Sequence, residues 1–239
     1  MRTKSNQRLQ WPSVANRQFC PRNLSHTISA MKVSNRKRLF STCIFVAVFV
    51  LSSVSALAQE DDLKVPAEIK PFIEKGFVAN ALEAADLNGD GTKDYVLVVN
   101  KPRDEKEQYD DIGDEARQTL ILARDSAGKL SLAARNDRVA FCRGCGGVFG
   151  DPFAGVTVKP GRFTVMNYGG SNDRWSDEYT FAYSKRDRTW QLVRAEESTF
   201  RATDPNRTMR THIRTPPKDF GLINFTDFDP ENYRRKGQK

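Results

Sequence analysis

Residues 154–195 read AGVTVKPGRFTVMNYGGSNDRWSDEYTFAYSKRDRTWQLVRA, and this stretch decides the fold class. Short runs rich in β-branched and aromatic residues alternate with tight turns, one of them at Pro160 and Gly161. In the run 177–184 aromatic residues alternate with small or polar ones, which is the period of a half-buried strand. Runs joined by such short turns pair as antiparallel hairpins. We therefore predict strands at 154–159, 162–168, 177–184 and 189–195.

The pattern extends in both directions from this stretch. Further strands are predicted at 77–85, 94–100, 117–124, 129–135 and 138–142, with a terminal strand at 220–225. A short helix is predicted over 66–75, because apolar residues recur there at helical spacing and Gly76 follows them. The predicted fold class is mainly β: a single antiparallel β domain, barrel- or sandwich-like, with one short N-terminal helix.

The charges are divided unevenly along the chain. The 239 residues contain 38 Lys and Arg against 30 Asp and Glu, a net charge of +8. Nine of the bases and none of the acids fall in residues 1–58, which leaves 29 bases and 30 acids in residues 59–239. The remainder has a net charge of −1 and no basic stripe, which argues against nucleic-acid binding.

The basic N-terminal part is typical of an export leader. Residues 31–58 contain a basic start, a short apolar core and the sequence Ala56-Leu57-Ala58 before Gln59, which is the order of a signal peptide with its cleavage site. Residues 1–30 are interpreted as a possible mis-start or leader extension. We expect residues 59–239 to form a single exported β-rich domain with a loosely ordered C-terminal tail. The expected location is periplasmic or secreted in a bacterial envelope, without a membrane span after cleavage.

The segment 86–94, DLNGDGTKD, is the strongest local motif. Oxygen-bearing side chains recur at loop positions 1, 3, 5 and 9, a glycine occupies position 6, and a backbone carbonyl is expected from position 7, as calcium requires. Leu97 replaces the glutamate of an EF-hand, and strands flank the loop. The alternative is an Asx-rich loop that holds its own turn without metal. The predicted ligands of a structural Ca²⁺ are Asp86, Asn88, Asp90, Thr92 and Asp94.

Cys142 and Cys145 are the only cysteines after the leader. A closed zinc site needs four ligands, and His212 is the only histidine in 59–239, which argues against a closed Cys-His site. Haem attachment requires a histidine directly after the second cysteine, where Gly146 stands. A structural disulfide in an oxidising compartment is the favoured interpretation. A redox pair and free thiols remain alternatives.

The region 146–175 mixes glycines with aromatic residues and lacks the spacing of a phosphate-binding loop. Glycines beside aromatic side chains are able to form the floor of a shallow ligand groove. The alternative is that they form bulges and corners of a curved sheet. The candidate groove residues are Phe149, Asp151, Phe153, Tyr168, Ser171, Arg174 and Trp175.

The order of these motifs resembles a group of small exported bacterial proteins of unknown function. The resemblance is carried by the acidic loop, then CxxCGGVFGDPFAGV, then GRFTVMNYGGS, and covers roughly residues 65–195. It implies an envelope protein with a single calcium loop like that of FG-GAP or VCBS repeats. It implies no activity and no catalytic residue.

The sequence contains no complete set of catalytic residues. His212 alone is available as a histidine base after the leader, and no G-x-S-x-G motif precedes a helix. Asp151 and Glu178 are a carboxylate pair to inspect beside Trp175. We expect a non-enzymatic binding or structural protein, with an envelope protein, peptide or glycan as its unknown partner. The alternative is a thiol–disulfide redox protein of the cell envelope that uses Cys142 and Cys145.

Overall fold

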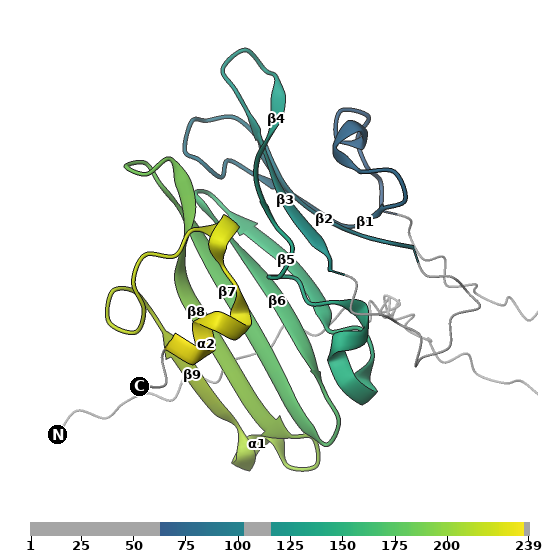
Figure 1. The fold of residues 1–239 in the computed structure, drawn as a ribbon, viewed down its shortest axis with the longest axis vertical. Helices are drawn as coiled ribbons and strands as arrows, with labels where there is room; N and C mark the ends of the chain where they lie inside the picture. Colours follow the sequence, from purple (N-terminus) through teal and green to yellow (C-terminus); the bar gives the residue numbers. More distant parts are fainter. Residues whose placement is uncertain (1–62, 103–115, 237–239) are drawn as a thin grey trace, which may run out of the picture. The chain divides into compact units, whose positions relative to one another are not determined.

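The computed structural model describes residues 63–102 and 116–236, all within the unit Ala58–Lys239 (Figure 1). The predicted leader and its signal peptide, residues 1–58, lie outside the described residues. The strands, in chain order, are β1 (Val78–Ala85), β2 (Asp94–Asn100), β3 (Gln118–Arg124), β4 (Leu130–Asn136), β5 (Phe153–Lys159), β6 (Arg162–Gly170), β7 (Asp173–Ser184), β8 (Thr189–Arg201) and β9 (Arg210–Arg214).

The strands form two antiparallel sheets. The first sheet has the order β1-β2-β3-β4 and the second sheet the order β5-β6-β7-β8-β9, so within each sheet the strands pair in the order of the sequence (Figure 1). The prediction of a mainly β, antiparallel fold is confirmed. Neither sheet closes on itself, so the described chain has two open sheets and not a closed barrel.

One hydrophobic core is shared by the two sheets. Val96 and Val98 of β2 belong to the same buried cluster as Phe163 of β6 and Phe181 of β7. We call the face of the second sheet that carries Phe163 and Phe181 its inner face. Successive side chains of a strand point to opposite faces, so this assignment fixes the face of the other residues in β6, β7, β8 and β9.

The other face of the first sheet has a smaller core of its own. The segment before β1 covers it, and Ile69 packs there against Leu97 and Leu120. Strand β2 is therefore buried on both faces, which explains its unbroken apolar run. The helix predicted over 66–75 is present only as one 3-10 turn, η1 (Lys70–Phe72), because Pro71 has no N–H to continue a helix.

The strand predicted at 138–142 is not formed. Two asparagine side chains bind this backbone instead of a neighbouring strand. The Oδ1 atom of Asn136 accepts the amides of Arg138 and Val139, both at 2.8 Å. Asn167 accepts the amide of Phe141 at 2.9 Å and donates to the carbonyl of Val139 at 3.0 Å. The prediction was wrong because side chains satisfy the backbone groups that a strand would pair.

The C-terminal segment completes the shared core. The predicted strand at 220–225 is reduced to one bridge between Asn224 and Gln191. The segment continues as η4 (Phe225–Asp227) and α2 (Pro230–Lys236), and Phe225, Phe228 and Tyr233 are buried against the second sheet. Tyr233, expected in a loosely ordered tail, is only 5% exposed. In the described ranges no helix has the length and apolar character needed to cross a membrane.

Candidate functional site

The acidic loop between β1 and β2 is held by hydrogen bonds to its own backbone. Asp86 accepts the amides of Gly89, Asp90 and Gly91 at 2.7, 3.2 and 3.0 Å. Asn88 accepts the amide of Asp90 at 2.9 Å, and Asp90 accepts the amide of Thr92 at 2.7 Å. The hydroxyl of Thr92 lies 2.5 Å from Asp90, and these contacts lower the pKa of Asp90.

Asp94 is the buried member of the loop. Its side chain is fully buried, and its two oxygens accept the amides of Leu87 and Arg124, both at 2.9 Å. Burial raises the pKa of Asp94; its two amide donors oppose this, and the charges of Asp90 and Asp86 raise it further. The charges of Asp86 and Asp90 thus act on the buried Asp94. Across 63–102 and 116–236 no three acidic, histidine or cysteine side chains are grouped closely enough to hold a metal ion.

The same loop joins the two sheets. The carbonyl of Asp86 accepts the amide of Gly161, in the turn between β5 and β6, at 2.8 Å. The carbonyl of Leu87 accepts the indole N–H of Trp190 at 3.1 Å. The Leu87 side chain is itself fully buried in the shared core. The loop therefore connects the first sheet to the second through two hydrogen bonds and the buried Leu87 side chain.

Cys142 and Cys145 form a disulfide, as predicted. Their Cα atoms are 5.2 Å apart, and the amide of Cys145 donates to the carbonyl of Cys142 at 3.1 Å. The pair lies where η3 (Arg143–Phe149) begins. Cys142 is buried and Cys145 is exposed.

Asp151 and Phe153 hold the segment after the disulfide in place. Arg117 is 1% exposed, and its guanidinium forms a two-pronged ion pair with Asp151. Arg117 also donates to the carbonyl of Phe141 at 2.9 Å, and its Cζ lies 5.1 Å from the ring centre of Phe153. These two predicted groove residues are thus occupied by contacts within the chain.

Three other predicted groove residues stack on one another. The rings of Phe149 and Tyr168 meet edge to face, with centres 4.9 Å apart. The guanidinium of Arg174 lies 4.5 Å from the ring centre of Phe149. Ser171 is in the turn between β6 and β7, where its amide donates to the carbonyl of Asp173 at 3.1 Å.

Trp175 is separated from that stack by the sheet. It follows Arg174 directly in β7, so the two side chains point to opposite faces. Trp175 is on the inner face, opposite Gly169, and its ring lies 5.6 Å from that of Phe141. The seven predicted groove residues therefore do not form one groove. Glu178 is also on the outer face, away from Trp175, so Asp151 and Glu178 do not form a pair beside it.

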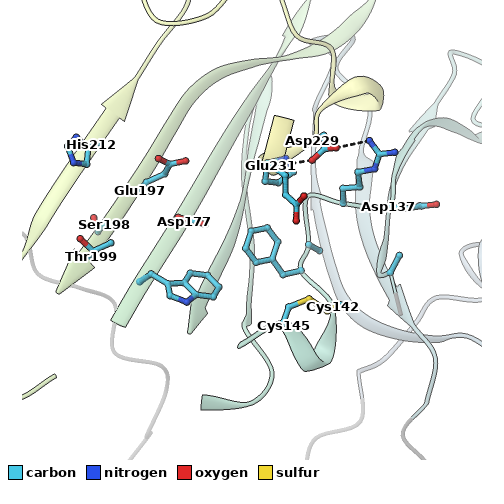
Figure 2. A pocket seen from close by; sticks show the side chains of 16 residues that line it. Asp137, Cys142, Cys145, Asp177, Glu197, Ser198, Thr199, His212, Asp229 and Glu231 are labelled. Atoms are coloured by element: carbon cyan, nitrogen blue, oxygen red, sulfur yellow. Dashed lines mark hydrogen bonds and ion pairs between the residues drawn. A yellow bond between two sulfur atoms is a disulfide. The ribbon is translucent and has the colours of Figure 1, made fainter. Parts of the chain in front are cut away.

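A hollow of about 910 Å³ lies on the inner face, beside Trp175 (Figure 2). Its walls come from β7, β8 and β9, from the disulfide and from the start of α2. Trp175 and both cysteines line it, and Figure 2 shows Glu197 and His212 on neighbouring strands. This acid-lined hollow, here called the inner hollow, is the candidate site.

A row of polar side chains crosses the inner face of the second sheet, and three of its four members, Asp177, Glu197 and His212, line the inner hollow. Asn167, Asp177, Glu197 and His212 are directly opposite one another on β6, β7, β8 and β9. Asp177 is 2% exposed. Glu197 is paired with Arg214 on β9 at 2.5 Å. The sequence analysis missed this row because it becomes visible only when the registers of three hairpins are combined.

The upper wall of the inner hollow is also charged. Asp229 is paired with Arg138 at 3.0 Å, and Glu231 follows it at the start of α2. Comparison of the chain with protein-family models and with curated proteins found no match.

Proposed function

We propose that the chain is an exported, non-enzymatic binding protein and that the inner hollow is its ligand site. The carrying observation is a hollow of about 910 Å³ that combines an aromatic wall with charged side chains from several elements. Sites for small molecules and side chains have this size and this mixture of apolar surface and a few placed polar groups. The proposed ligand comes from an envelope protein, a peptide or a glycan.

The walls of the hollow are held rigidly, which favours binding. The disulfide fixes one wall, and Asn167 fixes the backbone of Phe141 beside it. Trp175 is seated on Gly169, which has no side chain to displace the indole. A wall that is already ordered loses little conformational entropy when a ligand binds.

Export is proposed from the leader. Residues 31–58 have the order of a signal peptide, and the remaining chain is close to neutral. The disulfide between Cys142 and Cys145 suits an oxidising compartment such as the periplasm or the exterior. The N-terminal residue of the exported protein, determined by mass spectrometry, tests this directly: Gln59 is expected, and a retained leader contradicts export.

We also propose that the acidic loop binds a structural Ca²⁺ through Asp86, Asn88, Asp90, Asp94 and the carbonyl of Thr92. The donor chemistry fits, because each carboxylate oxygen has two acceptor positions and each oxygen of Asp94 accepts one amide hydrogen. Bound calcium would offset the mutual repulsion of the three carboxylates. It would stiffen the loop that joins the sheets.

The calcium proposal is tested by the melting temperature with calcium and with a chelator. The full chain is expected to melt higher with calcium, and Asp90→Ala is expected to remove that difference. The matched control is Asp125→Ala, because Asp125 also accepts two amides of its own turn, from Ala127 and Lys129. Equal melting temperatures with and without calcium in the unmodified chain contradict a calcium site.

A redox function of the cysteine pair is the second candidate. It is favoured by one observation: both cysteines line the inner hollow. Against it, Cys142 is 6% exposed, whereas a redox pair needs an accessible first sulfur. If the disulfide is structural, the double variant Cys142→Ser and Cys145→Ser loses about 2 kcal/mol of stability by the loop-entropy estimate and still binds ligand. Thiol–disulfide exchange with a dithiol protein, lost in Cys142→Ser, supports the redox candidate.

The binding function is tested by blocking the inner hollow. Thr199 is exposed on the inner face directly opposite Trp175, so Thr199→Trp fills the space next to it. The control, Thr157→Trp, makes the same change at an exposed position of β5. Basic peptides, acidic peptides and neutral oligosaccharides are screened by isothermal calorimetry. Binding by one class that survives Thr157→Trp and is lost in Thr199→Trp supports the function; no binding by any class contradicts it.

A further inference from the structure

Arg174 is a cation without an acidic partner on the outer face of the second sheet, the face opposite the inner face. Its Cζ lies 4.5 Å from the ring centre of Phe149 and 5.9 Å from that of Tyr168. Its Nη1 atom is buried and has no hydrogen-bond partner, and no acidic side chain of 63–102 or 116–236 pairs with it. Buried polar atoms in native proteins are nearly always paired. An acceptor that pairs with this guanidinium therefore gains free energy that water does not already supply.

The acids near Arg174 do not offset its charge. Asp173, its neighbour in β7, points to the opposite face and pairs there with an arginine of β8 at 3.6 Å. Asp151 forms its ion pair with Arg117. Glu178 is on the same face of β7 but four residues away, which is about 13 Å along a strand. Salt screens exposed charges beyond about 8 Å at physiological ionic strength, so the charge of Arg174 dominates this part of the outer face.

Exposed apolar surface adjoins this guanidinium. Phe149 is 49% exposed, and Val148, which precedes it in η3, is 83% exposed. The ring of Tyr168 contacts those of Phe149 and Phe200, with ring centres 4.9 and 6.3 Å apart. Phe200 is directly opposite Arg174 on β8. We call Phe149, Tyr168, Arg174 and Phe200 the outer stack. Because Arg174 is only partly buried, a ligand reaches its guanidinium from solvent, and that ligand also contacts the rings.

The outer stack suits a carboxylate that has apolar neighbours. A guanidinium matches a carboxylate with two parallel hydrogen bonds. A membrane surface and a phosphorylated peptide are typically bound by clusters of basic residues, whereas one guanidinium stands here. A neutral glycan would leave the guanidinium without an acceptor of opposite charge. A peptide supplies both parts of the match, because an acidic residue is easily flanked by apolar ones.

We propose that the outer stack binds an acidic peptide segment, with an Asp or Glu carboxylate on Arg174 and an adjacent apolar side chain on the rings of Phe149 and Phe200. The site goes beyond the proposed function, because it is on the opposite face of the sheet from the inner hollow and does not depend on it. Three residues of the predicted groove, Phe149, Tyr168 and Arg174, thus keep a ligand-binding role at a smaller site of their own.

The experiment uses three capped peptides. The probe is acetyl-Gly-Phe-Glu-Phe-Gly-amide. The second peptide has glutamine in place of the glutamate, which removes the charge and keeps the shape, and the third has alanine in place of both phenylalanines. Isothermal calorimetry on the full chain is expected to show at least about tenfold tighter binding of the probe than of the glutamine peptide. The probe is expected to bind at least about threefold more tightly than the alanine peptide. Raising the salt concentration reduces the first difference.

Variants locate the effect. Arg174→Gln is expected to abolish the preference for the probe over the glutamine peptide. Arg174→Lys is expected to reduce that preference without abolishing it, because an ammonium keeps the charge and lacks the planar fork. Phe149→Ala is expected to weaken binding of the probe and to keep the charge preference. The matched control is Arg201→Gln, because Arg201 is exposed on the neighbouring strand and points to the opposite face; no change is expected there. Circular dichroism melts establish that each variant is folded.

The outcomes separate this site from the inner hollow. Equal binding of the probe and the glutamine peptide overturns the proposal, as does a preference that persists in Arg174→Gln. Binding of the probe that Thr199→Trp removes also overturns it, because the peptide then occupies the inner hollow. If Arg174→Gln does not fold, Phe149→Ala decides, and unchanged binding of the probe in that variant counts against the outer stack.

Phosphatidylglycerol vesicles test the membrane alternative. The chain is expected not to sediment with them. Sedimentation that Arg174→Lys weakens, together with equal binding of the charged and uncharged peptides, would assign the outer stack to a lipid surface and overturn the proposal. A failure of the inner hollow to bind any ligand leaves the outer stack unaffected, because Thr199→Trp alters only the opposite face.

Discussion

The indole of Trp175 lies directly over the backbone of Gly169, its partner on the neighbouring strand. A Cβ atom at residue 169 would lie 2.6 Å from Cζ2 of Trp175 and 3.0 Å from the carbonyl oxygen of Gly146. Side chains in folded proteins do not approach so closely, so either the ring or the segment after the disulfide would have to move. The glycine therefore sets the position of one wall of the inner hollow.

Gly169→Ala is expected to destabilise the fold by about 1–3 kcal/mol, as overpacking does, and to displace Trp175. Chemical denaturation measures the first effect and tryptophan fluorescence the second. Gly221→Ala is the control, because a Cβ there meets nothing within 4 Å. The double variant Gly169→Ala with Trp175→Ala is expected to recover part of the loss. Equal stability of Gly169→Ala and the control would show that Trp175 is not seated in this way.

Asp151→Asn is expected to cost about 2–3 kcal/mol, because it weakens charge-assisted hydrogen bonds to a buried guanidinium. Arg117 is 1% exposed, and its Nη1 donates to Asp151 at 2.6 Å. Asp173→Asn is the matched control, since Asp173 pairs with Arg201 at 3.6 Å on the surface and both side chains are exposed. A loss below about 0.5 kcal/mol is expected for that pair. Urea denaturation of the two variants compares them, and equal losses contradict the buried pair.

Asn136→Ala is expected to release the C-terminal segment. The side-chain amide of Asn136 donates to the carbonyls of Phe225 and Phe228 at 2.6 and 2.8 Å, and both hydrogen bonds are buried. The variant loses these two bonds and also the acceptor of the Arg138 and Val139 amides, at a cost of at least about 2 kcal/mol. Hydrogen exchange in 225–233 is expected to accelerate. Asn206→Ala, at an exposed position, is the control. Unchanged protection of the 225–233 amides from hydrogen exchange in Asn136→Ala would show that Asn136 does not hold the C-terminal segment, the contact we call the Asn136 clamp.

Glu178→Gln is expected to stabilise the protein at neutral pH. Burial raises the pKa of Glu178, the charge of Glu196 opposite it on β8 raises it further, and Arg194 partly opposes them. A folded-state pKa above the unfolded value makes stability fall as pH rises through the acidic range and keeps it lowered above that range.

The variant removes this pH-dependent loss. Melting temperatures at pH 7.5 are expected to be higher for Glu178→Gln than for the unmodified chain, with the difference vanishing near pH 3.5. Glu83→Gln, at an exposed position of β1, is expected to give no pH-dependent difference. A Glu178→Gln variant that is no more stable at pH 7.5 would show that the charge is accommodated without cost.

Local sequence patterns predicted most of the strands, because in most of them apolar residues alternate with polar ones or the strand is buried on both faces. Residues 177–184 and 94–100 belong to β7 and β2, as expected. Strand β9 was missed because its residues Arg210–Arg214 are mostly exposed and polar, so its pairing with β8 left no apolar signature. The segment 138–142 was assigned wrongly because a strand and a loop held by asparagine side chains share the same apolar content.

The candidate site was less accessible to sequence analysis than the fold. The disulfide between Cys142 and Cys145 could be predicted from their spacing and from the absence of the histidines that a zinc or haem site requires. The row Asp177, Glu197 and His212 spans 36 positions of sequence, and nothing in its spacing marks it. It is assembled only by the registers of β7, β8 and β9. Arg174 and Trp175 show the opposite error. These adjacent residues were predicted to line one groove, but in β7 their side chains point to opposite faces of the sheet.

The clamp between Asn136 and the carbonyl of Phe228 also has a consequence for the order in which the protein matures. It joins groups 92 residues apart in the chain, and Phe225 and Phe228 supply buried aromatic surface to the shared core. A nascent or partly translocated chain lacks this last piece, and contacts so distant in sequence form late. We therefore expect the C-terminal segment to dock last and to complete the shared core. If the leader directs export, late docking of this segment would delay folding until most of the polypeptide has crossed the membrane.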